Sequence, residues 1–364
     1  MSIVIIGSNV AGITAIGTIF KEIQSSGQKS KYSITVVSKS SHIYGNPTAP
    51  RLLVEPQHAD KVFFSVENYL KNHSKGVKYE FIHSSVDKTD FNSKILTLSS
   101  GKELKYDYLI IASGSHAESP AFKLHGDYLE SKKAIKEVNK SIQDSGSIAI
   151  LGGGATGVET ASEIAYSFPK KKVTLFTGAE GPLSAIGKSI PASKKLEKLG
   201  IKIVNKKRFS SIDSTDTGAS VITFADGSSE TFDFYLPTYG VYPNSDFLDS
   251  KYLDDNGYLI VDKNLAVRGH SDVIALGDVA SITENSIVDI KFQQTKVFTQ
   301  TVKKTIFKKD VKLVDYSRGK TTTLIPISKN GGVGLMFGWS VPNFLVKQIK
   351  SKDFMISQVG KDYI

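Results

Sequence analysis

The chain has 364 residues, a formal net charge of +10 and no cysteine. Without thiols it cannot build a disulfide scaffold, a thiolate metal site or a cysteine nucleophile. Its length leaves room for roughly two to three domains, and the excess of lysine and arginine predicts attraction to anionic partners.

The first element is an apolar strand over residues 3–6, followed by Gly7, Gly12 and a helical pattern that begins near Ala11. In a βαβ unit, glycines at such a turn let backbone N–H groups approach a pyrophosphate. Asn9 stands where the middle glycine of this pattern is usual. The next strand ends in Ser38 and Lys39 instead of an acid, so a ribose would receive only a weaker contact from serine.

Further along, residues 94–107 alternate between apolar and polar side chains, and a continuous apolar run follows from Tyr108 to Ala112. This pattern predicts a small hairpin that leads into a buried parallel strand.

A second glycine-rich loop contains Gly152, Gly154 and Gly157, and it again follows an apolar strand and opens a helix. Two such loops in one chain predict two bound dinucleotides, as in an enzyme whose flavin takes hydride from a nicotinamide. We therefore expect FAD and NADH or NADPH as cofactors. The strand after this loop ends in Thr177 and Gly178, with neither an acid nor an arginine, so the sequence leaves the choice of nicotinamide open.

The alternating pattern predicts an α/β fold with two Rossmann-like dinucleotide-binding domains and a small C-terminal α+β domain. We expect residues 1–118 and 245–289 to form a discontinuous FAD-binding domain, 119–244 an inserted NAD(P)H-binding domain, and 290–364 the C-terminal domain.

Three segments, ILGGGATGVETASEIA, KYDYLIIASGS and SDVIALGDVA, resemble motifs of the two-dinucleotide flavoproteins. This family includes glutathione reductase, apoptosis-inducing factor and type II NADH dehydrogenases. NPTAPR, KNGGVG and IKSKDF are similar to segments of the small apoptosis-inducing-factor-like quinone reductases of the ferroptosis-suppressor type.

The resemblance implies roles for particular residues. Glu159 would lie beside flavin and nicotinamide, where it would relay a proton to a reduced quinone or hydrogen-bond the nicotinamide amide, and Lys350 would stabilise a reduced flavin or quinone anion. Asp278 would hold ribityl or phosphate groups, with Gly277 permitting close approach. The remaining cofactor-binding candidates are Gly7, Asn9, Ala11, Gly12, Ser38, Lys39, Asn46, Arg51, Val86, Ala112, Ser113, Gly114, Gly152, Gly154, Gly157 and Gly240.

Each assignment has a structural alternative. Asp278 can be a helix N-cap, Glu159 an acid that interacts with a helix dipole, and Lys350 an exposed lysine on a basic helix. The first loop can also be a degenerate site that binds no flavin. The histidines show no ligand-like spacing, so we predict no metal site.

The absence of cysteine excludes thiol-dependent branches of this family. The leading hypothesis is an FAD-dependent NAD(P)H:quinone oxidoreductase. The rival is a redox-regulated interaction protein whose basic surface binds a partner or nucleic acid, although no recognisable nucleic-acid-binding motif supports the latter.

No apolar run reaches the roughly 18 residues that a membrane span requires. Lys347, Lys350 and Lys352 alternate with apolar residues from Phe344 to Ile349, a pattern typical of a segment resting on an anionic membrane or of a helix docked into its own core. The first strand begins too early for a targeting segment. We expect a cytoplasmic protein, with peripheral attachment to a membrane such as the mitochondrial surface left open.

Overall fold

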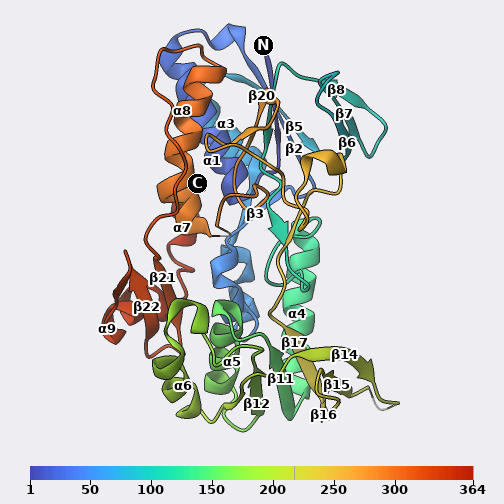
Figure 1. The fold of residues 1–364 in the computed structure, drawn as a ribbon, viewed down its shortest axis with the longest axis vertical. Coiled ribbons are helices and arrows are strands. Elements are labelled where there is room, and N and C mark those ends of the chain that lie inside the picture. Colours follow the sequence, from blue (N-terminus) through green and yellow to red (C-terminus); the bar gives the residue numbers. More distant parts are fainter. Residues whose placement is uncertain (217, 285, 364) are drawn as a thin grey trace.

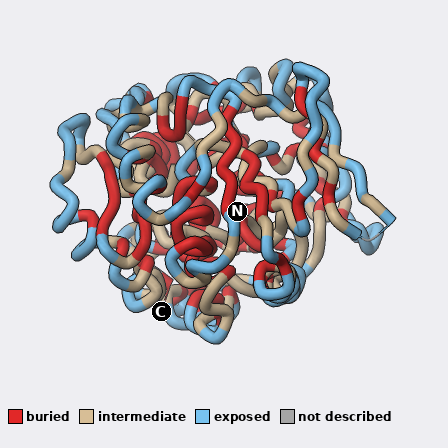
Figure 2. Tube along the Cα trace, turned by 90° about the horizontal axis from the view of Figure 1, so that it is seen from below, coloured by how far each residue is buried: buried red, intermediate tan, exposed pale blue. Residues whose placement is uncertain are grey.

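The computed structural model describes residues 1–216, 218–284 and 286–363. The chain forms two lobes, one built on a mostly parallel sheet and one on a wholly parallel sheet, and the C-terminal segment runs along both lobes (Figure 1). Buried residues concentrate in the central strands and the helices against them, as Figure 2 shows.

The first lobe contains a six-stranded sheet. All neighbouring strands are parallel except the antiparallel edge pair β19–β20. The strands in spatial order are β19 (Ala266–Val267), β20 (His270–Ala275), β9 (Tyr108–Ile111), β1 (Ser2–Ile6), β2 (Ser33–Ser38) and β5 (Lys78–His83). The central strands are nearly continuous apolar runs, and they are buried in one hydrophobic core together with helical residues and with apolar residues of the segment 86–104.

Helix α1 (Val10–Ser26) starts directly after the first glycine loop and ends at Gly27, which has a left-handed φ of 69°. Helix α3 (Val66–Ser74) is capped by Ser65, whose side chain accepts from the N–H of Asn68. The predicted hairpin is present as part of an antiparallel meander of β6 (Val86–Asp90), β7 (Ile95–Leu98) and β8 (Glu103–Lys105).

The second lobe repeats this plan with a four-stranded parallel sheet. Its strands in spatial order are β13 (Lys202–Val204), β12 (Lys172–Phe176), β11 (Ser147–Leu151) and β17 (Phe234–Pro237). Its helices are α4 (Tyr128–Asp144), α5 (Ala155–Ser167) and α6 (Ser189–Glu197), and its meander consists of β14 (Phe209–Ser214), β15 (Ser220–Phe224) and β16 (Ser229–Phe232).

One segment joins the two lobes. Residues 44–63, which include α2 (Ala49–Leu52), leave the first lobe and share a hydrophobic core with the second. The short antiparallel pairs are β3 (His42–Tyr44) with β4 (Phe63–Ser65) and β10 (Ser115–His116) with β18 (Tyr242–Pro243).

The C-terminal segment has two parts. Helices α7 (Ile287–Asp289) and α8 (Thr295–Thr305), with a π-helical turn between them, pack on the first lobe, and α8 contacts α1. A three-stranded sheet of β21 (Thr323–Pro326), β22 (Gly332–Met336) and β23 (Trp339–Ser340) then packs against α5 and α6. Helix α9 (Asn343–Val346) continues into a π-helical turn, Lys347–Ser351. The domain limits given above stay predictions. Residues 290–316, which we assigned to the C-terminal domain, contribute to the hydrophobic core of the first lobe.

Candidate functional site

Both lobes and the C-terminal segment line one cavity of about 780 Å³. Most of the predicted site residues belong to its wall. These are Gly7, Asn9, Ala11, Ser38, Lys39, Asn46, Val86, Ala112, Ser113, Gly114, Glu159, Gly240, Asp278 and Lys350. The other predicted residues, Gly12, Arg51, Gly152, Gly154, Gly157 and Gly277, are not part of this wall as the described residues define it.

The first loop leaves no room for side chains where it turns. Gly7 has a φ of 100°, and a Cβ added there would lie 2.3 Å from the carbonyl oxygen of Ala112. Asn9 is compatible with the turn because its φ is −82°, a value open to any residue. Its Oδ1 accepts a 3.2 Å hydrogen bond from the N–H of Tyr44. The substitution of the middle glycine therefore keeps the loop geometry and ties the loop to β3.

The hydroxyl of Ser38, at the end of β2, accepts hydrogen bonds from two other serines of the protein. It accepts from the hydroxyl of Ser8 at 2.8 Å and from the N–H of Ser40 at 3.3 Å. Lys39 is exposed and lines the cavity. The strand end that usually supplies a ribose carboxylate thus presents a buried hydroxyl and a cation here.

Asp278 faces the cavity from the turn after β20. Its carboxylate forms a 2.6 Å ion pair with Nζ of Lys123 and accepts from the Ser115 hydroxyl at 2.8 Å. No helix of the described chain starts at Asp278, so the N-cap alternative is wrong. Sequence reasoning missed Lys123, which lies in an irregular segment between β10 and α4 and belongs to no recognisable motif.

The two predicted catalytic residues meet at the wall of the cavity. Nζ of Lys350, on the π-helical turn, donates to Oε1 of Glu159 on α5 at 2.6 Å and to the carbonyl oxygen of Leu324 at 3.2 Å. Their side chains are 14% and 7% exposed. Lys350 is therefore a buried partner of Glu159, and the alternative of a solvated lysine is wrong.

Burial raises the pKa of the Glu159 carboxyl, while the charge and hydrogen bond of Lys350 oppose that shift and the nearby Glu163 adds to it. A carboxyl group with a raised pKa can carry a proton at a pH where an exposed glutamate is ionised. The pair can therefore store a proton at the cavity wall.

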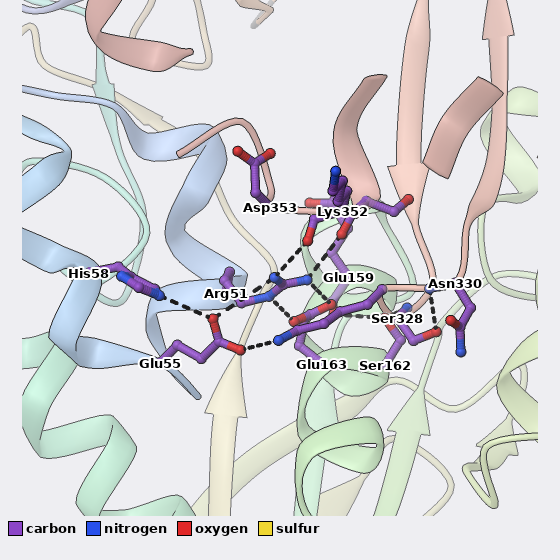
Figure 3. A network of polar contacts seen from close by, with 12 residues as sticks. Arg51, Glu55, His58, Glu159, Ser162, Glu163, Ser328, Asn330, Lys352 and Asp353 are labelled. Carbon is purple, nitrogen blue, oxygen red and sulfur yellow. Dashed lines mark hydrogen bonds and ion pairs between the residues drawn. The ribbon is translucent and has the colours of Figure 1, made fainter. Parts of the chain in front are cut away.

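Arg51 belongs to a network of polar contacts that also contains Glu163 and Glu159 (Figure 3). Its guanidinium is buried and ion-paired with Glu163, and its Nη2 also donates to the carbonyl oxygen of Ser351 at 3.1 Å. The ring of Phe354 lies between the two cations, 5.2 Å from the Arg51 guanidinium carbon and 5.4 Å from Nζ of Lys350. Arg51 thus joins the two lobes and the C-terminal segment, and its position does not support the predicted direct contact with a cofactor.

The second loop reaches the cavity only through the first turns of α5, where Thr156 and Glu159 line the wall. Gly154, at the N-cap of α5, is exposed, and no atom would lie within 4 Å of a Cβ added there. The backbone N–H groups at this helix start are therefore open to a ligand from outside the main cavity.

The described residues contain neither a metal-binding cluster nor a membrane-spanning helix. No group of three or more histidine, aspartate or glutamate side chains among them can hold a metal ion. In the same part of the chain, no helix is both long and apolar enough to cross a membrane.

The comparisons with known proteins agree with this geometry. Residues 1–304 match the family model described as pyridine nucleotide-disulphide oxidoreductase. The chain belongs to this family. It is 32% identical to the oxidoreductase ptaL of Pestalotiopsis fici, over 97% of this chain and 96% of that protein. It is 26% identical to ferroptosis suppressor protein 1 of Xenopus tropicalis, over 99% of this chain and 95% of that protein.

Among solved structures, the fold is similar to that of the sulfide:quinone oxidoreductase of Aquifex aeolicus. The TM-score is 0.77 at 15% identity, with 100% of this chain and 92% of that one covered. The predicted family resemblance and α/β fold class are confirmed, and the protein is an oxidoreductase of a family that works with pyridine nucleotides. Its lack of cysteine separates it from the disulfide chemistry in the family's name.

Proposed function

We propose that this protein is an FAD-dependent oxidoreductase that takes hydride from NAD(P)H and passes electrons to a quinone-type acceptor. The observation that carries the proposal is the Lys350–Glu159 ion pair at 2.6 Å, placed in the wall of a cavity that also contains the first glycine loop and Asp278. The cavity wall fits FAD because Gly7 permits the tight turn after β1, where a Cβ would lie 2.3 Å from the Ala112 carbonyl oxygen, and because this turn leads into the start of α1 at the cavity, where backbone N–H groups favour a pyrophosphate.

Bound FAD would supply the chemistry, by accepting hydride from NAD(P)H and releasing electrons to the acceptor. The chain's own residues bind and orient it. Gly7 and Asn9 line the side of the cavity formed by the start of α1, and Asp278, paired with Lys123, offers a hydrogen-bond acceptor to hydroxyl groups.

The Lys350–Glu159 pair supplies charge and protons. The Lys350 ammonium stabilises negative charge that develops beside it, more strongly than in water because the site is largely buried. When Glu159 is ionised, its Oε1 accepts from Lys350, and when its carboxyl group is protonated it holds a proton for release. The overall reaction of NAD(P)H, one proton and a quinone gives NAD(P)+ and a quinol, and we propose that this pair relays the one proton that the hydride does not carry.

A quinone is favoured as acceptor by three observations. Thiol-dependent acceptors are excluded by the absence of cysteine. Apolar residues of the C-terminal segment, namely Leu324, Ile349 and Met355, line the cavity that Lys350 also lines, and Lys350 donates to the carbonyl oxygen of Leu324. The resemblance to quinone reductases of the ferroptosis-suppressor type points to the same acceptor class.

The C-terminal segment also exposes large apolar side chains, which we call the apolar rim: Phe292, Phe337, Trp339, Phe344, Leu345 and Ile349. Phe292 and Ile349 reach the cavity wall, and Phe292 and Phe337 line a common small hollow. Val346, in contrast, is buried. We propose that this rim rests on an anionic membrane, with Lys347 and Lys352 facing lipid headgroups, so that a lipid-soluble quinone enters without crossing water.

The visible spectrum of the purified protein tests the proposal. Under anaerobic conditions NADH or NADPH should bleach a flavin band, and a short-chain ubiquinone analogue should restore it. Glu159→Gln should bleach normally but reoxidise with quinone on the order of 100-fold more slowly, because it cannot relay a proton. A protein that shows no flavin band after incubation with FAD would refute the proposal and favour the interaction-protein alternative.

A further inference from the structure

We propose that Arg208 recognises the 2′-phosphate of NADPH, so that NADPH is the preferred electron donor. This inference rests on the proposed function, because it assumes that the second lobe binds the nicotinamide cofactor. In a dinucleotide-binding fold, the residues at the end of the second strand read the adenosine ribose. A carboxylate there accepts from the 2′-hydroxyl of NADH, and an arginine nearby accommodates the 2′-phosphate of NADPH.

The strand in question is β12, which runs beside β11 and the second glycine loop. It is followed by Thr177 and Gly178, so no carboxylate stands at its end. A Cβ added to Gly153 would lie 2.5 Å from the side chain of Thr177. The glycine loop and the end of β12 are thus in direct contact, as a shared nucleotide site requires.

Three backbone hydrogen bonds bring the segment before Arg208 to this strand end. The N–H of Thr177 donates to Val204, the N–H of Lys207 donates to Thr177, and the N–H of Lys206 donates to Ala179, each at 3.0 Å. Arg208 is therefore fixed beside Gly178 although it lies 30 positions later in the sequence, which explains why the strand end shows no arginine in the sequence itself.

The side chain of Arg208 packs across Gly178. A Cβ at Gly178 would lie 2.8 Å from Cγ and 3.2 Å from Nε of the arginine, so only glycine leaves space for this stem. Arg208 is exposed. Among the described residues, no hydrogen bond or ion pair engages its guanidinium, which leaves its donors available to a ligand.

The neighbouring carboxylates already have cationic partners. Glu180 pairs with Lys206 at 2.8 Å, and Asp226 pairs with Lys207. These acids do not repel a phosphate as strongly as unpaired ones would, and they do not neutralise Arg208. A planar guanidinium with free donors beside a nucleotide loop matches the geometry of a phosphate monoester.

Calorimetry on the FAD-loaded protein tests the inference without turnover. The probes are 2′,5′-ADP, which carries the 2′-phosphate, and 5′-ADP, which does not. We expect 2′,5′-ADP to bind at least about tenfold more tightly. Arg208→Met should abolish this preference while changing the affinity for 5′-ADP less than about twofold. Arg208→Lys should keep only part of it, because an ammonium cannot bind bidentately.

Lys202→Met is the matched control, since Lys202 is an exposed cation on β13 whose removal changes the net charge equally. It should leave the preference intact. Equal affinity of the wild-type protein for both probes, or an unchanged preference in Arg208→Met, would overturn this inference and leave the proposed function standing. Failure of both probes and of NADH to bind would overturn the proposed function together with it.

Discussion

Gln294 holds the backbone of Gly277: its Oε1 accepts a 2.7 Å hydrogen bond from the glycine N–H. Its Nε2 donates in turn to the buried Asp289 at 2.8 Å, and Asp289 also accepts from the hydroxyl of Tyr316. The turn that presents Asp278 to the cavity is thus fixed by a fully buried side chain from the segment that leads into α8. A Cβ at Gly277 would lie 2.5 Å from the Cβ of Ala11, so this turn also packs tightly on α1.

We expect Gln294→Met to destabilise the protein by about 1–3 kcal/mol, because it leaves the Gly277 N–H without its partner and removes one of the hydrogen bonds to Asp289. It should also weaken FAD retention, since Asp278 loses its rigid support. Thermal unfolding and the flavin absorbance after gel filtration measure the two effects. Gln300→Met, at a half-buried position of α8, is the control. Full flavin retention in Gln294→Met would contradict this role of the glutamine.

Substitution by alanine should change the stability of the protein to very different extents at two glycines of the second loop. A Cβ at Gly157 would lie 1.8 Å from the carbonyl oxygen of Gly152, so Gly157→Ala forces the loop apart and should cost at least about 2 kcal/mol. Gly154 has a φ of −76° and open space before it, so Gly154→Ala should change stability by less than about 0.5 kcal/mol.

The same Gly154→Ala protein should bind NAD(P)H weakly, because its methyl group occupies the approach of the pyrophosphate to the helix start. Unfolding curves and nucleotide titrations of the two variants separate the structural role from the binding role. Normal nucleotide affinity in Gly154→Ala would show that the phosphates do not bind at this loop.

Loss of the buried Arg51 cation should be costly. Arg51→Met leaves Glu163 buried without its partner, and we expect a loss of about 3–5 kcal/mol in denaturant-induced unfolding. Lys140→Met removes an exposed partner of Asp144 and should cost less than about 0.5 kcal/mol. Adding Glu163→Leu to Arg51→Met should recover part of the loss, since it removes the unpaired acid. A cost for Arg51→Met as small as that for Lys140→Met would contradict the structural role assigned to it.

The raised pKa of Glu159 predicts a pH dependence of stability. Because its pKa is higher in the folded than in the unfolded state, its contribution to stability is complete below the unfolded value and is lost as the pH rises through the folded value. The free energy of unfolding of the wild type minus that of Glu159→Gln should therefore fall with pH in this window, by up to about 1.4 kcal/mol per pH unit. A difference that rises instead would show that Lys350 outweighs burial.

Trp339 is the single tryptophan of the chain and is 77% exposed on the apolar rim, so it reports directly on membrane contact. Its fluorescence should shift to shorter wavelength when vesicles of phosphatidylcholine with phosphatidylserine are added, and less with phosphatidylcholine alone. Phe344→Ser should weaken the shift. An unchanged spectrum with both kinds of vesicle would exclude contact through this rim.

Local sequence patterns were sufficient to predict the elements that carry the site. The strands before Gly7 and Gly152 and the helices after them lie where apolar runs and glycines predicted them, because both signals act within a few residues. The hairpin before β9 and the buried strand that follows are also present as predicted.

Such local patterns could not predict which residues pair with each other when they lie far apart in the sequence. Glu159 and Lys350 were each singled out through family resemblance, but only the packing of the C-terminal turn on α5 shows that they bind each other. Lys123 lies in an irregular segment without a signature, and its contact with Asp278 spans the two lobes. Arg51 was predicted to bind a cofactor because it belongs to the NPTAPR segment, but in the structure it forms an ion pair with Glu163.

The position of Arg51 also has a consequence for biosynthesis. Its guanidinium needs Glu163 and the main-chain oxygens of residues 351 and 352, so its acceptors are complete only after nearly the whole chain has been translated. Until then the Arg51 guanidinium lacks the two carbonyl oxygens that accept from it in the complete chain. These hydrogen bonds are contacts of very high sequence separation, which places the final assembly of the cavity late in folding. A chain truncated before residue 350 would therefore contain both glycine loops but lack Lys350 and the last two acceptors of Arg51.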